Sequence, residues 1–352
     1  MHVTKKKLGI IAHTDVFLII LENENHVQVS IMTYGGTITE IALPDKKSGL
    51  QNIVLSLGDW KDYIDNPLYL GANLGPSAGR IRGGYLVIGG KEYTLSQNDG
   101  NHNLHGGFSP ISFANWSIQN MEEHKEYVSL TLTTTLKDGQ DGFPGERQIT
   151  TTYQLDNSDK LTLEYKAVSD KDTYFNLSNH SYFNLTGDFS KSGLKQYLSI
   201  EADTYVTNDK EYIPIRFSSV ENSPYDFRQP ITMEEQIRKY PNVSEITYTK
   251  GYNNGYDIRE AIKNEQPVLS LWNQERTKGL RMYTDSPCIV VYSGGYIGSS
   301  FQLKDGFISS DSCAIALEAQ DFPNTFELLH SSYSITGRDE TYQRKIIYEF
   351  HY

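Results

Sequence analysis

Cysteines and clustered basic residues are scarce in this sequence, and both absences restrict its class. Of 352 residues, two are cysteines, Cys288 and Cys313, which is too few for a disulfide framework and typical of an intracellular protein with free thiols. The formal net charge of −12 at pH 7 argues against a nucleic-acid partner, because neutralising phosphates requires clustered Lys and Arg. The basic run Lys5–Lys7 is better explained as a solvated terminus.

Long apolar runs are also missing. The apolar stretch from Leu8 to Leu21 is interrupted by His13, Thr14 and Asp15, so it is neither a signal-peptide core nor long enough to span a membrane. We therefore expect a soluble, cytoplasmic protein without a membrane partner. Tyrosine, by contrast, is abundant at 25 residues, which suits strands and aromatic-lined polar pockets.

Helical patterns are few, and alternation with a period of two residues dominates. In residues 126–136 and 160–168, apolar and polar side chains alternate, as expected of strands with one face in a core. The clearest helix signal begins at Thr232, where Glu235 completes a capping box and Pro241 follows the end. Residues 257–264 are compatible with one or two helical turns. No repeat or linker divides the chain, so residues 1–352 are predicted to form one all-β domain, a large antiparallel sandwich with long loops over one face.

Two short motifs suggest chemistry that their surroundings do not support. Residues 75–79, GPSAG, fit the pattern of a serine nucleophile, but that turn requires a helix after the serine. The continuation is broken by glycines and then strand-like, so a tight loop presenting Arg80 is the better interpretation. His102 and His105 form an H-x-x-H pair, yet no further Cys or His ligands cluster nearby, so we expect no metal. One of these histidines is expected to bind substrate, because the adjacent glycines allow a ligand to approach the backbone.

Two further segments each contain one residue suited to proton transfer. His180 lies in FNLSNHSYFNL (175–185), among aromatic and leucine side chains, where a single histidine is more often a neutral core residue. Glu318 follows an apolar, strand-like run, and alternation places it on the same face as Gln320. Burying a carboxylate is costly and raises its pKa, so an inward Glu318 would be unusual; exposure at the end of the strand is the equally supported alternative.

A histidine and a glutamate that converge across a pocket form an acid/base pair. One donates a proton while the other removes one, and each acts best with a pKa near the working pH. The side chains around them would include Arg80, His105, amides and aromatics, with no evident nucleophile or phosphate loop. That set suits a neutral ligand rich in hydroxyls, such as a sugar.

Several segments together resemble the aldose 1-epimerase (galactose mutarotase) family. They occur in the family's order and spread over most of the chain, so the combination is specific although each segment alone is weak. The segments are GRI (79–81), NLHGG (103–107), DGFPGERQITTTYQL (141–155), NLSNHSYFNL (176–185), SPYDFRQP (223–230) and LEAQDFPN (317–324). The resemblance implies a large antiparallel β-sandwich that interconverts the α and β anomers of a free aldose without a cofactor or metal.

The resemblance also implies roles for individual residues. His180 corresponds to the general acid that protonates the ring oxygen, and Glu318 corresponds to the general base that takes the proton of the C1 hydroxyl. Arg80 and His105 correspond to the family's substrate-contacting arginine and histidine. The further residues expected at the substrate are Asn253, Tyr182 and Gln320.

Four positions depart from the family pattern. Pro76 and Gly79 replace an arginine and an asparagine, Asn253 stands where many members have a sugar-binding aspartate, and Val290 stands where many have a glutamine. A site that hydrogen-bonds a particular hydroxyl discriminates strongly, so these changes predict a preferred sugar that need not be galactose. The alternative is a diverged member that still handles glucose and galactose through water-mediated contacts.

Two other functions are compatible with the sequence. A non-catalytic sugar-binding or sensing protein on the same scaffold would explain the changed binding positions, although not the presence of both His180 and Glu318. A glycoside hydrolase would need a second carboxylate flanking the bond, and Asp226, Asp257 and Asp321 cannot be placed from the sequence. The sequence is compatible with either a monomer or a homodimer.

Overall fold

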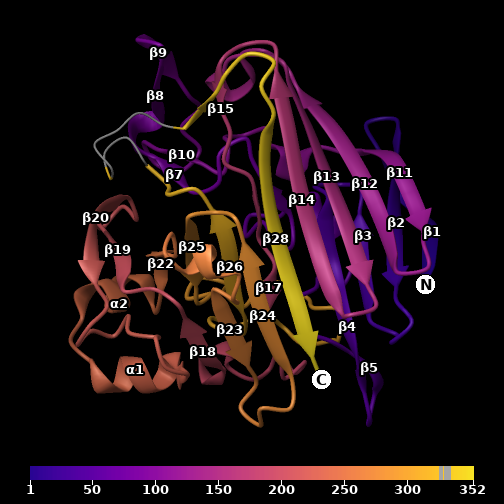
Figure 1. The fold of residues 1–352 in the computed structure, drawn as a ribbon, viewed down its shortest axis with the longest axis vertical. Coiled ribbons are helices and arrows are strands. Elements are labelled where there is room, and N and C mark those ends of the chain that lie inside the picture. Colours follow the sequence, from indigo (N-terminus) through magenta and orange to yellow (C-terminus); the bar gives the residue numbers. More distant parts are fainter. Residues whose placement is uncertain (325–327, 329–333) are drawn as a thin grey trace.

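The long antiparallel sheets expected from the alternation are present in the computed structural model, which describes residues 1–324, 328 and 334–352 (Figure 1). The largest sheet has nine strands in the described part of the chain, in the order β11-β12-β13-β14-β28-β24-β23-β18-β21. Its strands are β11 (Ser117–Glu123), β12 (Tyr127–Leu136), β13 (Arg147–Asp156), β14 (Lys160–Ser169), β28 (Tyr342–His351), β24 (Gly279–Thr284), β23 (Leu269–Trp272), β18 (Tyr197–Ile200) and β21 (Ile231–Thr232).

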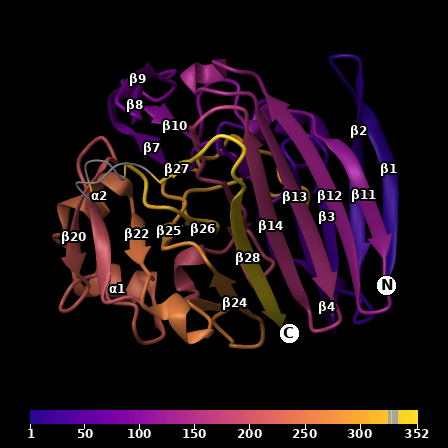
Figure 2. The same cartoon turned by 45° about the horizontal axis from the view of Figure 1, so that its top comes forward.

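A second layer packs on this sheet and begins with the N-terminal strands. These are β1 (His2–Ile11), β2 (Thr14–Glu22), β3 (Gln28–Met32), β4 (Thr37–Asp45) and β5 (Gly49–Asn52), which pair in sequence order. Buried side chains of this sheet, such as Leu21 and Val29, share one core cluster with Leu130 and Leu163 of the large sheet. Figures 1 and 2 both show the indigo N-terminal strands beside β11 and β12.

The second layer continues in a sheet of six described strands that borders a cavity. The order is β17 (Tyr182–Phe183), β26 (Ile315–Gln320), β25 (Cys288–Tyr292), β22 (Asn253–Asp257), β19 (Thr204–Asn208) and β20 (Pro214–Ser219). An isolated bridge between Val54 and Phe183 joins this sheet to the segment after β5. Because both parts of the layer cover the nine-stranded sheet, their buried faces contribute to one apolar core.

Short strand pairs complete the described structure near the cavity. They are β6 (Asn73–Leu74) with β16 (Ser178–Asn179), β7 (Arg80–Ile81) with β10 (Asn103–Leu104), β8 (Tyr85–Ile88) with β9 (Lys91–Thr94), and β15 (Thr173–Tyr174) with β27 (Ile335–Thr336). The pair of β7 and β10 carries Arg80 and Leu104, which line the cavity.

The two α-helices of the described chain lie on the side of the molecule away from β1 (Figure 2). Helix α1 (Met233–Lys239) begins with the predicted capping box, because Thr232 accepts the N–H of Glu235 and Glu235 accepts the N–H of Thr232. Helix α2 (Ser244–Thr249) was not predicted, and residues 257–264 form a shorter 3-10 helix at Ala261–Asn264. None of the helices found in the described residues has the length and apolar character needed to cross a membrane.

Candidate active site

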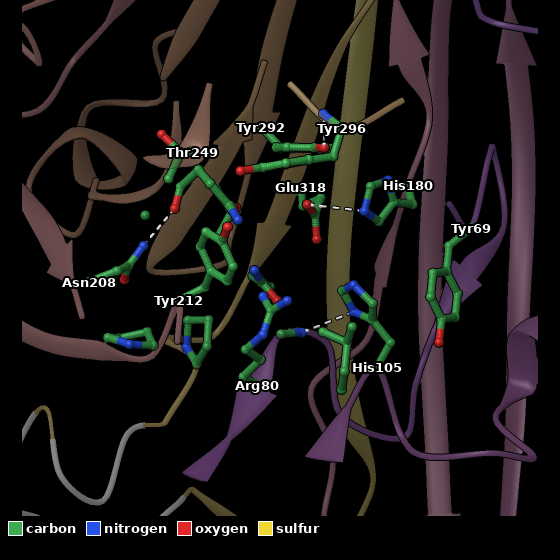
Figure 3. A pocket seen from close by; sticks show the side chains of 18 of the residues that line it. Tyr69, Arg80, His105, His180, Asn208, Tyr212, Thr249, Tyr292, Tyr296 and Glu318 are labelled. Carbon is green, nitrogen blue, oxygen red and sulfur yellow. Dashed lines mark hydrogen bonds and ion pairs between the residues drawn. The ribbon is translucent and has the colours of Figure 1, made fainter. Parts of the chain in front are cut away.

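A cavity of about 380 Å³ opens between the six-stranded sheet and the loops around β7 and β10. Polar and aromatic side chains dominate its wall, with His180 and Glu318 on one side and Asn208 and Thr249 on another (Figure 3). The lining comprises Pro67, Leu68, Tyr69, Gly79, Arg80, Leu104, His105, His180, Tyr182, Val206, Asn208, Tyr212, Pro214, Thr249, Asn253, Gly255, Val290, Tyr292, Tyr296, Glu318, Gln320 and Pro323.

Glu318 lies on β26 and points into this cavity. The strand is buried along its whole length, and its alternation brings Glu318 and Gln320 to the cavity, as predicted. The Glu318 side chain is 4% exposed, so the alternative of exposure at the strand end is wrong. Burial raises the pKa of Glu318 to about 8, and the nearby Arg80 guanidinium opposes that rise.

His180 faces Glu318 because its backbone is hydrogen-bonded on both sides. It follows β16 and precedes β17, which pairs with β26, and its N–H donates to the carbonyl of Ala72 (2.9 Å) while its own carbonyl accepts the N–H of Gly71 (3.0 Å). The His180 Nε2 atom lies 3.4 Å from Glu318 Oε1 (Figure 3). Burial lowers the pKa of His180 to about 4. The histidine and the carboxylate therefore form a desolvated pair at the cavity wall.

His105 is fixed by Gly79 through two hydrogen bonds. The Gly79 N–H donates to His105 Nδ1 (3.1 Å), and the His105 N–H donates to the Gly79 carbonyl (3.1 Å). Because Nδ1 accepts the hydrogen bond from the Gly79 N–H, it carries no proton itself, and the proton of the neutral ring is assigned to Nε2. Burial holds the pKa of His105 well below its usual range, so the ring is neutral at pH 7. His105 can therefore donate one hydrogen bond to a ligand.

Gly79 itself occupies a position that restricts side chains. Its φ is +72°, and a Cβ atom built there would lie 2.6 Å from Cβ of Pro323. The backbone angle favours glycine or asparagine, but the packing against Pro323 leaves room for glycine alone. An asparagine at this position, as in the family pattern, would therefore require Pro323 to shift.

Arg80 is held at the cavity by a charged partner and an aromatic ring. Its Nε donates to Asp99 Oδ2 (2.6 Å), and its guanidinium lies 5.2 Å from the ring centroid of Tyr212. The side chain is 18% exposed. A fixed guanidinium in a partly desolvated cavity supplies several N–H donors to hydroxyl or ring oxygens.

Comparison with known proteins agrees with this geometry. The sequence pattern of the family described as aldose 1-epimerase matches residues 18–349. The chain belongs to the aldose 1-epimerase family. An aldose 1-epimerase of Haemophilus influenzae is 31% identical over 310 residues, covering 88% of this chain and 87% of the relative. A galactose mutarotase of Sus scrofa is 28% identical over 307 residues, covering 87% and 86%. The crystal structure of galactose 1-epimerase from Lactobacillus acidophilus NCFM superposes with a TM-score of 0.88 at 26% identity, covering 99% of this chain and 98% of that one.

Family membership confirms three predictions from the sequence. The fold is the antiparallel β-sandwich of galactose mutarotase-like proteins, and the protein is an isomerase that interconverts the anomers of a free sugar. The non-catalytic alternative is not favoured. The glycoside hydrolase alternative lacks its second carboxylate, because Glu318 is the one acidic side chain among the described residues that line the cavity.

The structure also places the other candidates of this aldose 1-epimerase. Tyr182, Gln320, Asn253 and Val290 all line the cavity, and Tyr182 stacks on His180 with ring centroids 4.8 Å apart. The three acidic residues left open by the sequence are paired with arginines: Asp226 with Arg228, Asp257 with Arg259, and Asp321 with Arg344. These three aspartates do not line the cavity, so none of them supplies the second carboxylate that a hydrolase would require.

Two motif residues are structural. Ser77 is 1% exposed and bridges to Asn176, and β7 follows it in place of a helix, so the serine-nucleophile motif is accidental. His102 accepts the N–H of Gly83 through Nδ1 (3.1 Å) and lies outside the cavity lining. Of the H-x-x-H pair, His105 alone reaches the cavity.

A metal ion fits this donor set poorly. Among the described residues, His105, His180 and Glu318 offer ligand atoms within 4.8 Å of one another. Coordination would require the lone pair of His105 Nε2, yet the bond from Gly79 leaves the ring proton on that atom. If the proton moved to Nδ1, the Nδ1–H group would face the N–H of Gly79, and two donors would point at each other. The arrangement is better suited to donating a hydrogen bond to a sugar oxygen.

Several cavity residues could not have been found from the sequence alone. Tyr69, with a φ of +53°, contacts the His105 ring at 4.7 Å between centroids. Asn208 and Thr249 come from β19 and α2, and Tyr292 and Tyr296 come from β25 and the turn after it. None of these residues belongs to a segment that carried the resemblance. These residues converge because the tertiary structure brings distant elements to one cavity.

Proposed function

We propose that this aldose 1-epimerase opens and closes the sugar ring with His180 as general acid and Glu318 as general base. The observation that carries the proposal is the distance of 3.4 Å between His180 Nε2 and Glu318 Oε1. The C1 hydroxyl oxygen and the ring oxygen of an aldose are bonded to the same carbon, so one group must serve each of two neighbouring oxygens. A closely spaced pair in a desolvated cavity meets that requirement.

The reaction conserves protons and electrons. Ionised Glu318 takes the proton of the C1 hydroxyl, the bond between C1 and the ring oxygen breaks, and that oxygen receives a proton from His180. Rotation about C1–C2 then exposes the other face of the aldehyde. During closure, neutral His180 takes the proton of the attacking hydroxyl, and protonated Glu318 returns one to the C1 oxygen. No cofactor or metal takes part.

His180 and Glu318 together hold one transferable proton, whichever of the two residues carries it. With a pKa of about 8 for Glu318 and about 4 for His180, the proton resides on Glu318 at pH 7. The productive arrangement, an ionised Glu318 beside a protonated His180, contains the same number of protons. A single transfer from Glu318 to His180 produces it, and Arg80 favours that transfer because it stabilises ionised Glu318.

The preferred substrate is a neutral free aldose that need not be galactose. Asn253 contributes a neutral amide where a carboxylate is common in the family. Val290, packed with Val206 and Phe322, contributes an apolar surface. A hydroxyl facing Val290 would lose its hydrogen bond, so a C–H group is favoured there.

The oligomeric state is proposed to be a monomer or a homodimer, and the compartment is proposed to be the cytoplasm.

Polarimetry tests the proposal directly. Freshly dissolved α-anomers of glucose, galactose, xylose, arabinose and maltose should equilibrate faster with the protein than in buffer. Glu318→Gln and His180→Asn should each lower the rate by about 10²–10⁴-fold, the usual contribution of positioned proton transfer. Full activity in either variant would overturn the role assigned to that residue. Equal rates with and without protein for all five sugars would overturn the proposed substrate class.

A further inference from the structure

Asn208, Thr249 and Asn253 form one side of the cavity, here named the recognition wall. Two of these residues lie on neighbouring strands whose backbone pairing is incomplete. In the described chain, β19 and β22 share one antiparallel residue pair, Tyr205 with Tyr256. Continuing that register would place Asn208 opposite Asn253, but no backbone pairing is formed there. The antiparallel pairing is limited to Tyr205 and Tyr256, and Asn208 and Asn253 both line the cavity.

Side-chain hydrogen bonds connect β19, β22 and α2 where the backbone pairing is incomplete. Glu245 Oε1, from α2, accepts the backbone N–H of Asn208 (3.0 Å) and the Nδ2 of Asn254 (2.7 Å). Asn254 Nδ2 also donates to the carbonyl of Val206 (2.9 Å), and Asn208 Nδ2 donates to the carbonyl of Asn253 (2.6 Å). The ends of β19 and β22 are therefore held at a fixed spacing with their backbone groups satisfied.

Glu245 is the shared member of these contacts. It is 7% exposed. Its backbone carbonyl accepts a hydrogen bond from the hydroxyl of Thr249 (2.6 Å), the third member of the recognition wall. One buried carboxylate thus connects α2, β19 and β22, and each of these elements contributes one residue to the wall. Glu245 does not itself line the cavity, so its effect on a ligand is indirect.

We propose that Glu245 is a positioning residue that sets sugar recognition by fixing the recognition wall. The proposal rests on the proposed function of the cavity and extends it to a residue outside the cavity lining. The proton-transfer pair is supported by different elements, since His180 is bonded to Gly71 and Ala72 and Glu318 lies on β26. Disturbing Glu245 should therefore affect substrate binding and discrimination, and leave the chemical step largely intact.

The test compares Glu245→Leu, which removes the acceptor, with Glu245→Gln, which keeps an oxygen able to accept both hydrogen bonds. Polarimetry on α-glucose and α-galactose, which differ in the orientation of one hydroxyl, gives kcat and KM for each. In Glu245→Leu, KM should rise by about tenfold with kcat within about threefold of wild type, and the ratio of kcat/KM between the two sugars should change. Glu245→Gln should restore KM to within about threefold of wild type.

Asn23→Ala is the matched control. Asn23 is a buried side chain that donates to the carbonyl of Asp156 (2.8 Å), and neither residue lines the cavity. The control should lose thermal stability without a change in KM or in the sugar ratio. If Glu245→Leu does not fold, Asn254→Ser carries the test, because it removes the amide that joins Glu245 to Val206.

The outcomes separate this proposal from the proposed function. A folded Glu245→Leu with wild-type KM and an unchanged sugar ratio would overturn the positioning role, as would a lower kcat at unchanged KM. If the wild type accelerates none of the five free sugars named under the proposed function, that function fails on its own. Titration calorimetry with the same sugars would then decide whether Glu245→Leu binds them about tenfold more weakly than wild type, as proposed, or equally well.

Discussion

At the residue scale, the His180–Glu318 pair predicts a rate that depends on pH in two directions. Below about pH 4 the pair gains a second proton and lacks a base, and above about pH 8 it loses its last proton and lacks an acid. The value of kcat/KM should therefore be highest between these limits and fall on both sides, with apparent pKa values that belong to the pair. Polarimetry across buffers of equal ionic strength checks this. A profile flat from pH 5 to pH 10 would contradict a proton shared between these groups.

The same burial predicts that Glu318 reduces stability at alkaline pH. Its pKa is 4.5 in a solvated chain and about 8 in the fold, so the folded state holds the proton more tightly. The resulting contribution to the free energy of unfolding is fully present below about pH 4.5 and is lost as pH rises through about 8. Glu318→Gln cannot ionise, so it should exceed wild type in stability at pH 9 by on the order of a few kcal/mol.

Urea unfolding at pH 5 and pH 9 measures this difference. The stability advantage of Glu318→Gln should be small at pH 5 and large at pH 9, because only the ionised carboxylate is penalised by burial. An advantage of the same size at both pH values would show that shape or packing, and not charge, causes it. Loss of activity together with a gain in stability would be typical of a residue kept for catalysis.

At the element scale, the segment Asn66–Ala72 supports the catalytic side of the cavity. The buried Asn66 side chain accepts the N–H of Leu70 (2.9 Å) and donates to the Leu70 carbonyl (3.1 Å). These bonds close the loop that holds Tyr69 at a φ of +53°, an angle unusual for an aromatic residue. Tyr69 then contacts His105, and the end of the segment bonds to the backbone of His180.

Asn66→Ala is therefore predicted to lower kcat by about tenfold with a smaller change in KM. The reason is that Tyr69 can relax and allow His105 and His180 to shift, and small displacements of catalytic groups reduce rates strongly. Steady-state polarimetry gives both constants, and Asn23→Ala again serves as the control for a lost buried amide. A change confined to KM would assign Asn66–Ala72 to substrate binding and contradict this prediction.

The elements also differ in how well the sequence could predict them. Strands β12 and β14 were predicted because their alternation is local and faces one core. Helix α2 was missed because SEITYT contains an isoleucine and two threonines of low helix propensity and lacks a capping side chain. Its contacts through Glu245 to Asn208 and Asn254 are tertiary and leave no periodic signal in the sequence.

The residues of the site also divide into those that the sequence predicts and those that it does not. His180 and Glu318 were identified through the family resemblance, and alternation along β26 supported Glu318 and Gln320. Asn208 and Tyr69 escaped prediction because one depends on the incomplete pairing of two strands and the other on a left-handed backbone angle. Both features arise from contacts between distant segments. Sequence patterns within a window of ten residues therefore cannot predict these features.

At the scale of the whole molecule, β28 joins parts of the chain that are distant in sequence. In the nine-stranded sheet it lies between β14 and β24, with an antiparallel partner on each side. Its side chains Ile346, Tyr348 and Phe350 belong to the largest core cluster. Strand β1, in contrast, is at the edge of its sheet and mostly exposed. The two terminal strands should therefore contribute very differently to folding.

The prediction that residues 1–352 form one domain can be tested through these strands. Removing residues 342–352 leaves the ladders of β14 and β24 without their shared partner and opens the core, so the protein should fail to fold. Removing residues 1–12 takes away one edge strand, so that variant should fold and keep its kcat, with a lower melting temperature. The full chain should unfold in one transition, with calorimetric and van't Hoff enthalpies that agree. Two separate transitions, or an active variant lacking residues 342–352, would show that the sheet on either side of β28 is stable independently.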